Sequence, residues 1–297
     1  MPESRSTIIM DKIAKRKRKS GEDPNVYGPN ELKKPRVSPK EAFKIWIRPF
    51  HMLLTEPIVF CLSLLSGFSD MLIFIFLESF AVVYEQGWNF GILGIAWAII
   101  PINLAYFLTY FSYLPWFWRD RQLRTRINDD DMPPERRLKW LLWLAPFEPI
   151  GLMGFAWTSF GYSRDVPWIA SMIFSTCVGI ANYAIYLSSV DYMVASYGVY
   201  SASATGGNAF ARDLLAGVSA MFAIPMYHNI GDKWHVQYAS TVLSCLSVVV
   251  VAPIYVFYWY GSQIRARSKF AQALQAENKA NQGRRVSRLN SGQFNTV

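Results

Sequence analysis

The sequence predicts an all-α integral membrane protein with six transmembrane helices. Residues 57–260 contain six long apolar stretches, each near the ~20 residues that a helix needs to cross a ~30 Å hydrocarbon core. All but three of the 30 lysines and arginines (Arg164, Arg212 and Lys233) lie in residues 1–48, 119–139 and 265–288. An even number of spans puts both termini and the 119–139 loop on one side of the membrane, and the positive-inside rule makes that side cytoplasmic.

The polar ends flank this bundle as separate segments. Residues 1–56 form a basic linker, and its EAFKIWIRPFHMLL piece is expected to lie along the membrane interface. The KRKRK run is similar to a nuclear localisation signal, but with spans following it a juxtamembrane linker attracted to anionic lipid is favoured. Residues 261–297 are expected to be a largely disordered tail. The lipid bilayer is thus an expected partner and nucleic acid is not.

Taken in order, the spans differ in where polar or helix-breaking residues fall. The second holds Pro101, the third is kinked by Pro146 and Pro149 around Glu148, and the fourth holds Asn182. The six predicted spans cover residues 57–84, 90–117, 138–160, 168–190, 197–229 and 238–260.

The fifth span carries a charge well inside its length. Arg212 lies roughly 20 Å along the helix from its start. Ser201, Thr205, Asn208 and Arg212 follow i, i+4, i+7 and i+11 spacing, which is one face of a helix. A polar stripe in lipid must face other helices or water. This helix is therefore predicted to lie inside the bundle.

The sequence gives no support to catalysis or metal binding. The three cysteines, Cys61, Cys177 and Cys245, fall in apolar segments and are expected to be small buried side chains. The three histidines share no metal-ligand spacing, and no nucleophile elbow, phosphate-binding loop or paired-cysteine motif is present. We therefore expect neither an enzyme nor a metal site.

Several stretches in order resemble one family, the fungal drug:proton antiporters of the major facilitator superfamily. YGVYSASATGGNAFAR with FAIPMYHNIGDKW is similar to that group's eleventh helix and the loop after it. The resemblance covers roughly residues 15–270. Its other stretches are KSGEDPNVYGPNEL, IFIFLESFAVVYEQGWNFGILGIAW, PPERRL, PIGLMGFAWTS and FYWYGSQIRARS.

The resemblance implies the carboxy-terminal six-helix half of this fold. Members of the group have twelve spans, and the match begins in their central loop, so we expect a truncated product or an incomplete gene model that lacks an amino-terminal half. The implied function is secondary active, proton-coupled efflux of hydrophobic cations or polyamines by alternating access, with the proton gradient as energy source and no cofactor. The alternative is a non-transporting remnant or an interaction or regulatory half. The plasma membrane is expected, with the vacuolar membrane as the alternative.

Two carboxylates of the first span are candidates for the substrate or proton pathway. Glu78, inside FLESF, matches a glutamate of the family's seventh-helix pattern and is either a substrate-facing or proton-exchanging group or an interfacial charge. Asp70 has no counterpart in that pattern, but its mid-span depth is the more costly place for a charge. Offset by eight residues, the two lie about 80° apart and could border one cavity.

The remaining candidates are Glu148, Arg212 and their polar neighbours. Glu148 is expected to carry a proton or a cationic substrate, or to pair with Arg212, and the pair is slightly favoured. Arg212 matches the family's GN-x-x-R pattern and is expected to be a structural or gating pair or a direct ligand, whereas Asp213 departs from it and is expected to face a different neighbour. Asn103, Asn182 and Asn208 are expected as cavity groups or interhelical hydrogen bonds. Gly206 and Gly207 are expected as close helix contacts, and Tyr183, Tyr186 and Trp157 as stacking platforms for cations.

Overall fold

The computed structural model describes residues 6–21, 26–28, 39–126, 133–160, 165–230, 234–268, 270 and 272. The 127–132 part of the basic loop, Arg164, Lys233 and the tail beyond residue 272 lie outside this description. The chain divides into two units, residues 1–48 and 49–297, and each is described by itself. The first unit contains α1 (Ser6–Ser20), and α3 (Pro39–Thr55) runs across the boundary.

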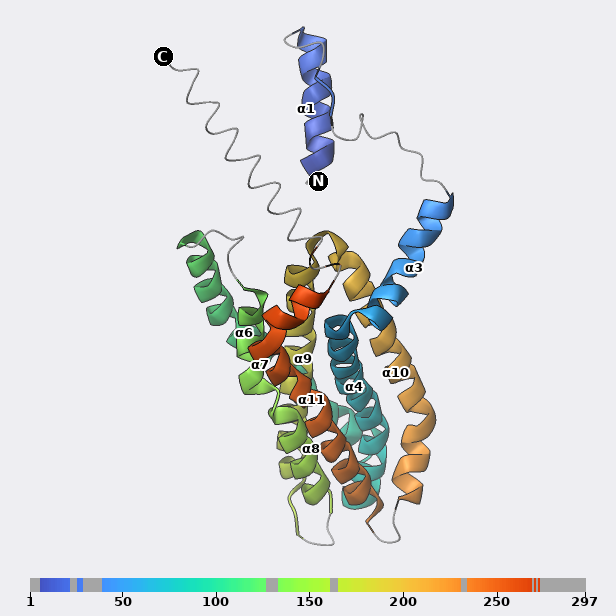
Figure 1. Ribbon diagram of the computed structural model, residues 1–297. Helices are drawn as coiled ribbons and strands as arrows, with labels where there is room; N and C mark the ends of the chain where they lie inside the picture. Colours follow the sequence, from blue (N-terminus) through green and yellow to red (C-terminus); the bar gives the residue numbers. More distant parts are fainter. Residues whose placement is uncertain are drawn as a thin grey trace. The chain divides into compact units, whose positions relative to one another are not determined.

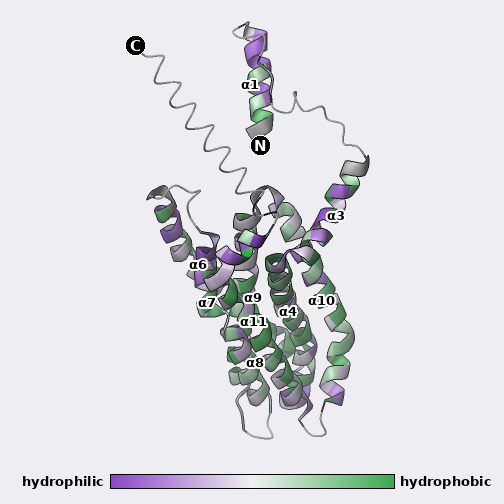
Figure 2. Cartoon of the chain, in the orientation of Figure 1, coloured by the Kyte–Doolittle hydropathy of each residue, from purple (hydrophilic) through white to green (hydrophobic). Residues whose placement is uncertain are grey.

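The second unit is a helical bundle, and five of its helical segments are long and apolar enough to cross a membrane (Figure 1). Hydrophobic residues run along them (Figure 2). The first continues from α4 through a π-helical turn, Ala81–Glu85, into the short α5, Gln86–Trp88. The long helices are α4 (Pro57–Phe80), α6 (Ile92–Arg126), α9 (Trp168–Tyr197), α10 (Ser201–Asn229) and α11 (His235–Arg267).

The predicted third span is not one helix. A 3₁₀ turn, Pro134–Leu138, leads into α7 (Lys139–Leu144) and then α8 (Phe147–Thr158). Six and twelve residues are each too short to cross a bilayer alone. The break falls at Ala145 and Pro146 because proline lacks an N–H and its ring clashes with the carbonyl four residues earlier. The third predicted span, expected as one kinked helix, is thus divided into two short helices, and five helices of the described residues are long enough to cross a membrane by themselves.

Several helices run past their predicted ends. α6 continues nine residues beyond 117, and α9 reaches Tyr197 rather than 190. No breaker stops α9 until Gly198, whose φ of 46° lies in the left-handed region that glycine tolerates. Gly198–Tyr200 forms one 3₁₀ turn before α10 begins. The fourth and fifth spans are thus joined by a tight turn.

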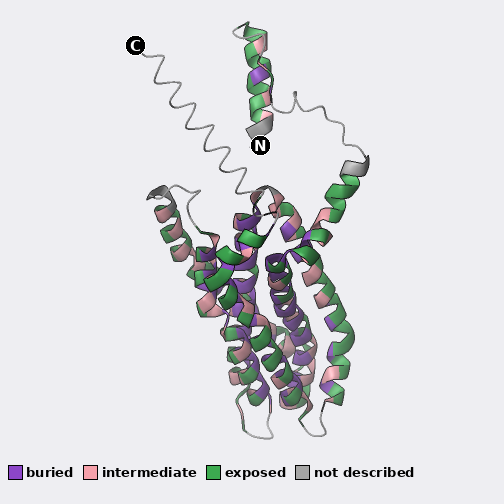
Figure 3. Ribbon diagram, in the orientation of Figure 1, coloured by how far each residue is buried: buried purple, intermediate pink, exposed green. Residues whose placement is uncertain are grey.

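α4 lies at the centre of this unit and packs most extensively against α10 (Figure 1). Figure 3 shows α4 largely buried and α10 largely exposed, so the prediction that the fifth span lies inside the bundle is wrong for this unit. The two helices approach closely at Gly67, where an added Cβ would lie 2.6 Å from Leu215 Cδ1 and 3.3 Å from the Ala211 carbonyl oxygen. A side chain at this position would require the Leu215 side chain to move and the α10 backbone at Ala211 to shift slightly, so glycine permits the close approach.

We expect Gly67→Val to destabilise the chain by about 1–3 kcal/mol, because its methyl groups would force α4 and α10 apart. The matched control is Gly217→Val on α10, since a Cβ at Gly217 meets nothing within 4 Å. Thermal unfolding of the purified chain in detergent checks the difference. Equal melting temperatures for the two variants would show that the close approach at Gly67 does not stabilise the bundle.

Candidate functional site: a polar layer across the bundle

A polar layer divides the apolar core of the bundle into two clusters. Along α4, one cluster ends at Leu65 and the other begins at Phe68. The same change of cluster occurs between Ala184 and Val178 on α9. Buried serines and other polar side chains occupy the gap on several helices; they include Ser66, Ser69, Glu148, Asn182, Asn208, Ser244 and Ser247. Five helices therefore contribute polar groups at one level of the bundle.

Arg212 of α10 pairs with Asp70 of α4 in this layer. The distance from Arg212 Nε to Asp70 Oδ2 is 3.4 Å, and the two side chains are 25% and 30% exposed. The Arg212 guanidinium also lies 5.0 Å from the centre of the Tyr186 ring on α9, a cation–π arrangement. The pair holds α4, α9 and α10 together, and its partial exposure leaves both charges open to a ligand.

Two expectations about Arg212 are wrong. Its ion pairs among the described residues join it to Asp70 and Asp213, not to Glu148. Asp213 does not face a different neighbour, because its Oδ1 lies 3.5 Å from Arg212 Nη2. Adjacent helical positions diverge by about 100°, but the long guanidinium side chain spans that angle. Asp213 itself is 71% exposed, so it adds a weak, solvent-screened contact.

Asn182 of α9 links three helices within the layer. The Tyr106 hydroxyl of α6 donates to Asn182 Oδ1 at 3.1 Å, and Asn182 Nδ2 donates to Ser69 Oγ of α4 at 3.3 Å. Asn182 also interacts with the neighbouring Asp70 carboxylate. Asn103 on α6, for which the sequence predicts the same roles as for Asn182, is exposed and donates only weakly, at 3.5 Å, to the carbonyl of Ile99 on its own helix.

Glu148 is fully buried at the start of α8. Ser69 is close enough to interact with its carboxyl group, although neither carboxyl oxygen has a described hydrogen-bond partner in good geometry. Its position in the first turn, just after the break at Pro146, places the group near the partial positive charge of a helix N-terminus. An unpaired ionised carboxylate in an apolar core costs several kcal/mol.

The other candidates take no described part in the Asp70–Arg212 pair or in the contacts of Asn182. Glu78 is half-buried on α4 and, at 1.5 Å per residue, about 12 Å from Asp70 along the helix. Asn208 is buried one turn before Arg212, and its Oδ1 has no described hydrogen-bond partner. An added Cβ at Gly207 would lie 2.8 Å from the Pro49 carbonyl oxygen, whereas one at Gly206 would make an ordinary 3.8 Å contact with Pro49.

Of the three aromatic candidates, two tyrosines lie at the polar layer and the tryptophan does not. Tyr186 lies under Arg212, and the Tyr183 ring lies 5.5 Å from the Tyr106 ring beside Asn182. Trp157 is half-exposed and contacts Phe160, away from the layer. Sequence reasoning missed Tyr106 and Ser69. Ser69 is adjacent to Asp70, and Tyr106 lies one helical turn after Asn103, so helical spacing from the chosen residues pointed near both.

Two further ion pairs, one buried and one half-buried, tie the helix ends together. Arg265 of α11 pairs with Glu135 of the 3₁₀ turn, and its Nη1 also lies 3.3 Å from the Tyr192 hydroxyl of α9. Arg137 pairs with Asp191. These pairs anchor the 3₁₀ turn before α7 to α9 and α11.

The polar layer offers charge, hydrogen-bond donors and aromatic surface, the groups that recognise a polar or cationic small molecule. Within the described ranges, no group of three or more histidine, cysteine, aspartate or glutamate side chains could hold a metal ion. The layer is suited to binding and to moving a proton between carboxyl groups and neighbouring hydroxyls.

Curated relatives of this chain are transporters. It is 30% identical over 272 residues to the probable drug/proton antiporter YHK8 of Saccharomyces cerevisiae, covering 91% of this chain and 51% of the relative. It is 29% identical to the MFS-type transporter acdC of Aspergillus candidus over 273 residues, 91% of this chain and 51% of the relative. The major facilitator superfamily multidrug transporter FLU1 of Candida albicans is 30% identical over 93% of this chain and 44% of its own length.

The other comparisons are empty: no protein-family model matches the sequence, and no solved structure matches it. The chain spans about half the length of the curated relatives it matches. Those relatives are transporters rather than enzymes, and the apolar helices are those of an integral membrane protein. This chain is an all-α membrane protein related to the transporters of the major facilitator superfamily.

Proposed function

We propose that the chain is the carboxy-terminal half of a secondary active transporter that exports hydrophobic cations or polyamines in exchange for protons. The observation that most directly supports this proposal is the Asp70–Arg212 pair, which lies partly exposed in a polar layer between two apolar clusters. The names of two relatives, a drug/proton antiporter and a multidrug transporter, support the substrate class. The plasma membrane, with both termini cytoplasmic, is the proposed location.

The geometry suggests how a cation and a proton would be exchanged. A cationic substrate would compete with Arg212 for the Asp70 carboxylate and could stack on Tyr186. Asn182 contacts both Asp70 and Ser69, and Ser69 interacts with Glu148, so these two side chains would connect the Asp70 carboxylate to the buried acid. Release of the Glu148 proton would follow when water or a cation enters the layer and stabilises the carboxylate.

Alternating access needs a second wall for the cavity. α10 leaves an apolar row of side chains exposed at helical spacing: Phe210, Leu214, Val218 and Met221. In a membrane, lipid or another six-helix half would cover this row. We propose an amino-terminal half as partner, with the substrate between the two halves.

A fusion of this chain to the amino-terminal half of the yeast relative tests the proposal. We expect vesicles containing the fusion to move ethidium, a fluorescent hydrophobic cation, when a pH gradient is applied. Glu148→Gln should remove the dependence on the gradient because glutamine cannot exchange a proton, and Asp70→Asn should reduce cation transport. The matched control is Asn103→Ala, an exposed polar residue at similar depth on α6.

Size-exclusion chromatography identifies fusions that fold. A folded fusion that moves no cation under any gradient would contradict transport and favour a non-transporting role. If the folded fusion transports the cation and both Glu148→Gln and Asp70→Asn behave like the parent, the chain transports but the polar layer takes no part in it.

A further inference from the structure

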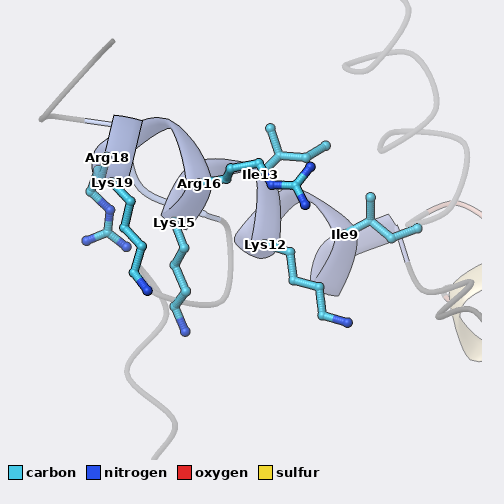
Figure 4. A pocket seen from close by; sticks show the side chains of 7 residues that line it. All are labelled: Ile9, Lys12, Ile13, Lys15, Arg16, Arg18 and Lys19. Atoms are coloured by element: carbon cyan, nitrogen blue, oxygen red, sulfur yellow. The ribbon is translucent and has the colours of Figure 1, made fainter. Parts of the chain in front are cut away.

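Helix α1 presents one exposed face that combines basic and apolar side chains. Ile9, Lys12, Ile13 and Arg16 follow i, i+3, i+4 and i+7 spacing, so they share a face, and Lys19 extends it by a further turn. All five are exposed, with Ile9 at 37% and Ile13 at 51%. Figure 4 shows basic side chains projecting from successive turns of α1, with the two isoleucines among them.

The opposite face of α1 is covered by the chain itself. Ala14 is buried, and Gly28 lies against Asp11, so closely that a side chain at Gly28 would clash. The Arg18 guanidinium lies 4.8 Å from the centre of the Tyr27 ring. Asp11 is the only acidic residue of α1, and it belongs to this covered face. The exposed face therefore carries three positive charges and no negative charge.

We propose that this face of α1 binds the anionic phospholipid headgroups of the membrane that the chain spans. Two isoleucines with flanking lysines and arginine have the composition of an interfacial helix, whose apolar side chains enter the headgroup region while its cations meet phosphates. Exposing an isoleucine side chain to water is unfavourable, and a basic segment that was solvated on all sides would have no use for two of them.

The linker between α1 and α4 keeps α1 within reach of the proposed ligand, the anionic lipid. α1 ends at Ser20 and α4 begins at Pro57, so the linker holds α1 within roughly 130 Å of the bilayer even at full extension. Tethering raises the effective concentration of lipid at α1, and the cytoplasmic leaflet supplies the negative charge. The proposal requires the amino-terminal segment to be cytoplasmic, but it does not require the chain to transport anything.

Hydrogen exchange of the full chain in lipid nanodiscs tests the binding. In nanodiscs of phosphatidylcholine with phosphatidylserine, we expect amides of residues 6–20 to exchange more slowly than in phosphatidylcholine alone, and raised salt should remove the difference. Each basic side chain near an anionic surface contributes roughly fivefold to binding, so reversing Lys12, Arg16 and Lys19 to glutamate should weaken it on the order of a hundredfold. Ile9→Ser with Ile13→Ser should also reduce the protection.

The control reverses Arg284, Arg285 and Arg288 to glutamate, which changes the net charge equally outside α1 and should leave α1 protection intact. Equal exchange in the two lipids would overturn the proposal, and so would protection that survives reversal of the three α1 charges. Slower exchange on adding an RNA oligonucleotide, without any effect of phosphatidylserine, would assign the face to nucleic acid and also overturn it.

Discussion

Arg265→Ala is expected to destabilise the chain by about 3–5 kcal/mol, because it leaves the Glu135 carboxylate buried and without its cation. Both side chains are about one-tenth exposed, and Glu135 Oε2 has no described hydrogen-bond partner to compensate. The backbone at Gly261 lies close to the same carboxylate, since a Cβ added there would lie 2.6 Å from Glu135 Oε1. The local structure therefore leaves little room for water to replace the guanidinium.

Thermal unfolding of the purified chain in detergent measures this loss. Arg267→Ala is the matched control, because it removes an exposed arginine two residues further along α11 and should change stability by less than about 0.5 kcal/mol. Arg265→Lys should give an intermediate result, since it keeps the charge but loses the planar fork of donors. The double variant Glu135→Gln with Arg265→Met should recover much of the stability lost in Arg265→Ala. If Arg265→Ala and Arg267→Ala unfold at the same temperature, the buried pair does not anchor the segment before α7.

Arg212→Ala is expected to cost about 2–3 kcal/mol, because it leaves the Asp70 charge at mid-depth in the membrane without its partner. Asp70→Asn should cost less, since Tyr186 and Asp213 still contact the guanidinium. The two residues are in contact, so their effects should not add. The double variant Asp70→Asn with Arg212→Ala should be more stable than Arg212→Ala alone, by about 1 kcal/mol or more.

The control for this cycle pairs Arg212→Ala with Glu78→Gln. Glu78 lies about 12 Å from Asp70 along α4, so its effect should add to that of Arg212→Ala within about 0.5 kcal/mol. Melting temperatures of the five variants in detergent complete the cycle. If the effects of Asp70→Asn and Arg212→Ala add, the 3.4 Å contact contributes no coupling free energy. The pair would then not be a functional unit of the proposed cavity.

The sequence was informative about features that depend on one helix at a time. Apolar length predicted the long spans, and the depth of Arg212 and Asp70 identified both as costly charges that need an explanation. The break of the third span was predicted only as a kink. Pro101, Pro115, Pro225 and Pro253 leave their helices continuous, whereas Pro146 with Pro149 does not, and that outcome depends on packing around them as well as on the prolines themselves.

By itself, the sequence determined a helical membrane protein, its approximate spans and the charges that lie inside them, because hydropathy and helical periodicity are local properties of the chain. The tertiary structure decided which charges meet. It paired Arg212 with Asp70 instead of Glu148 and brought Tyr106, Asn182 and Ser69 into one network. Pairing depends on how neighbouring helices are rotated and offset, and close contacts such as that at Gly67 set both. No spacing within one helix contains that information.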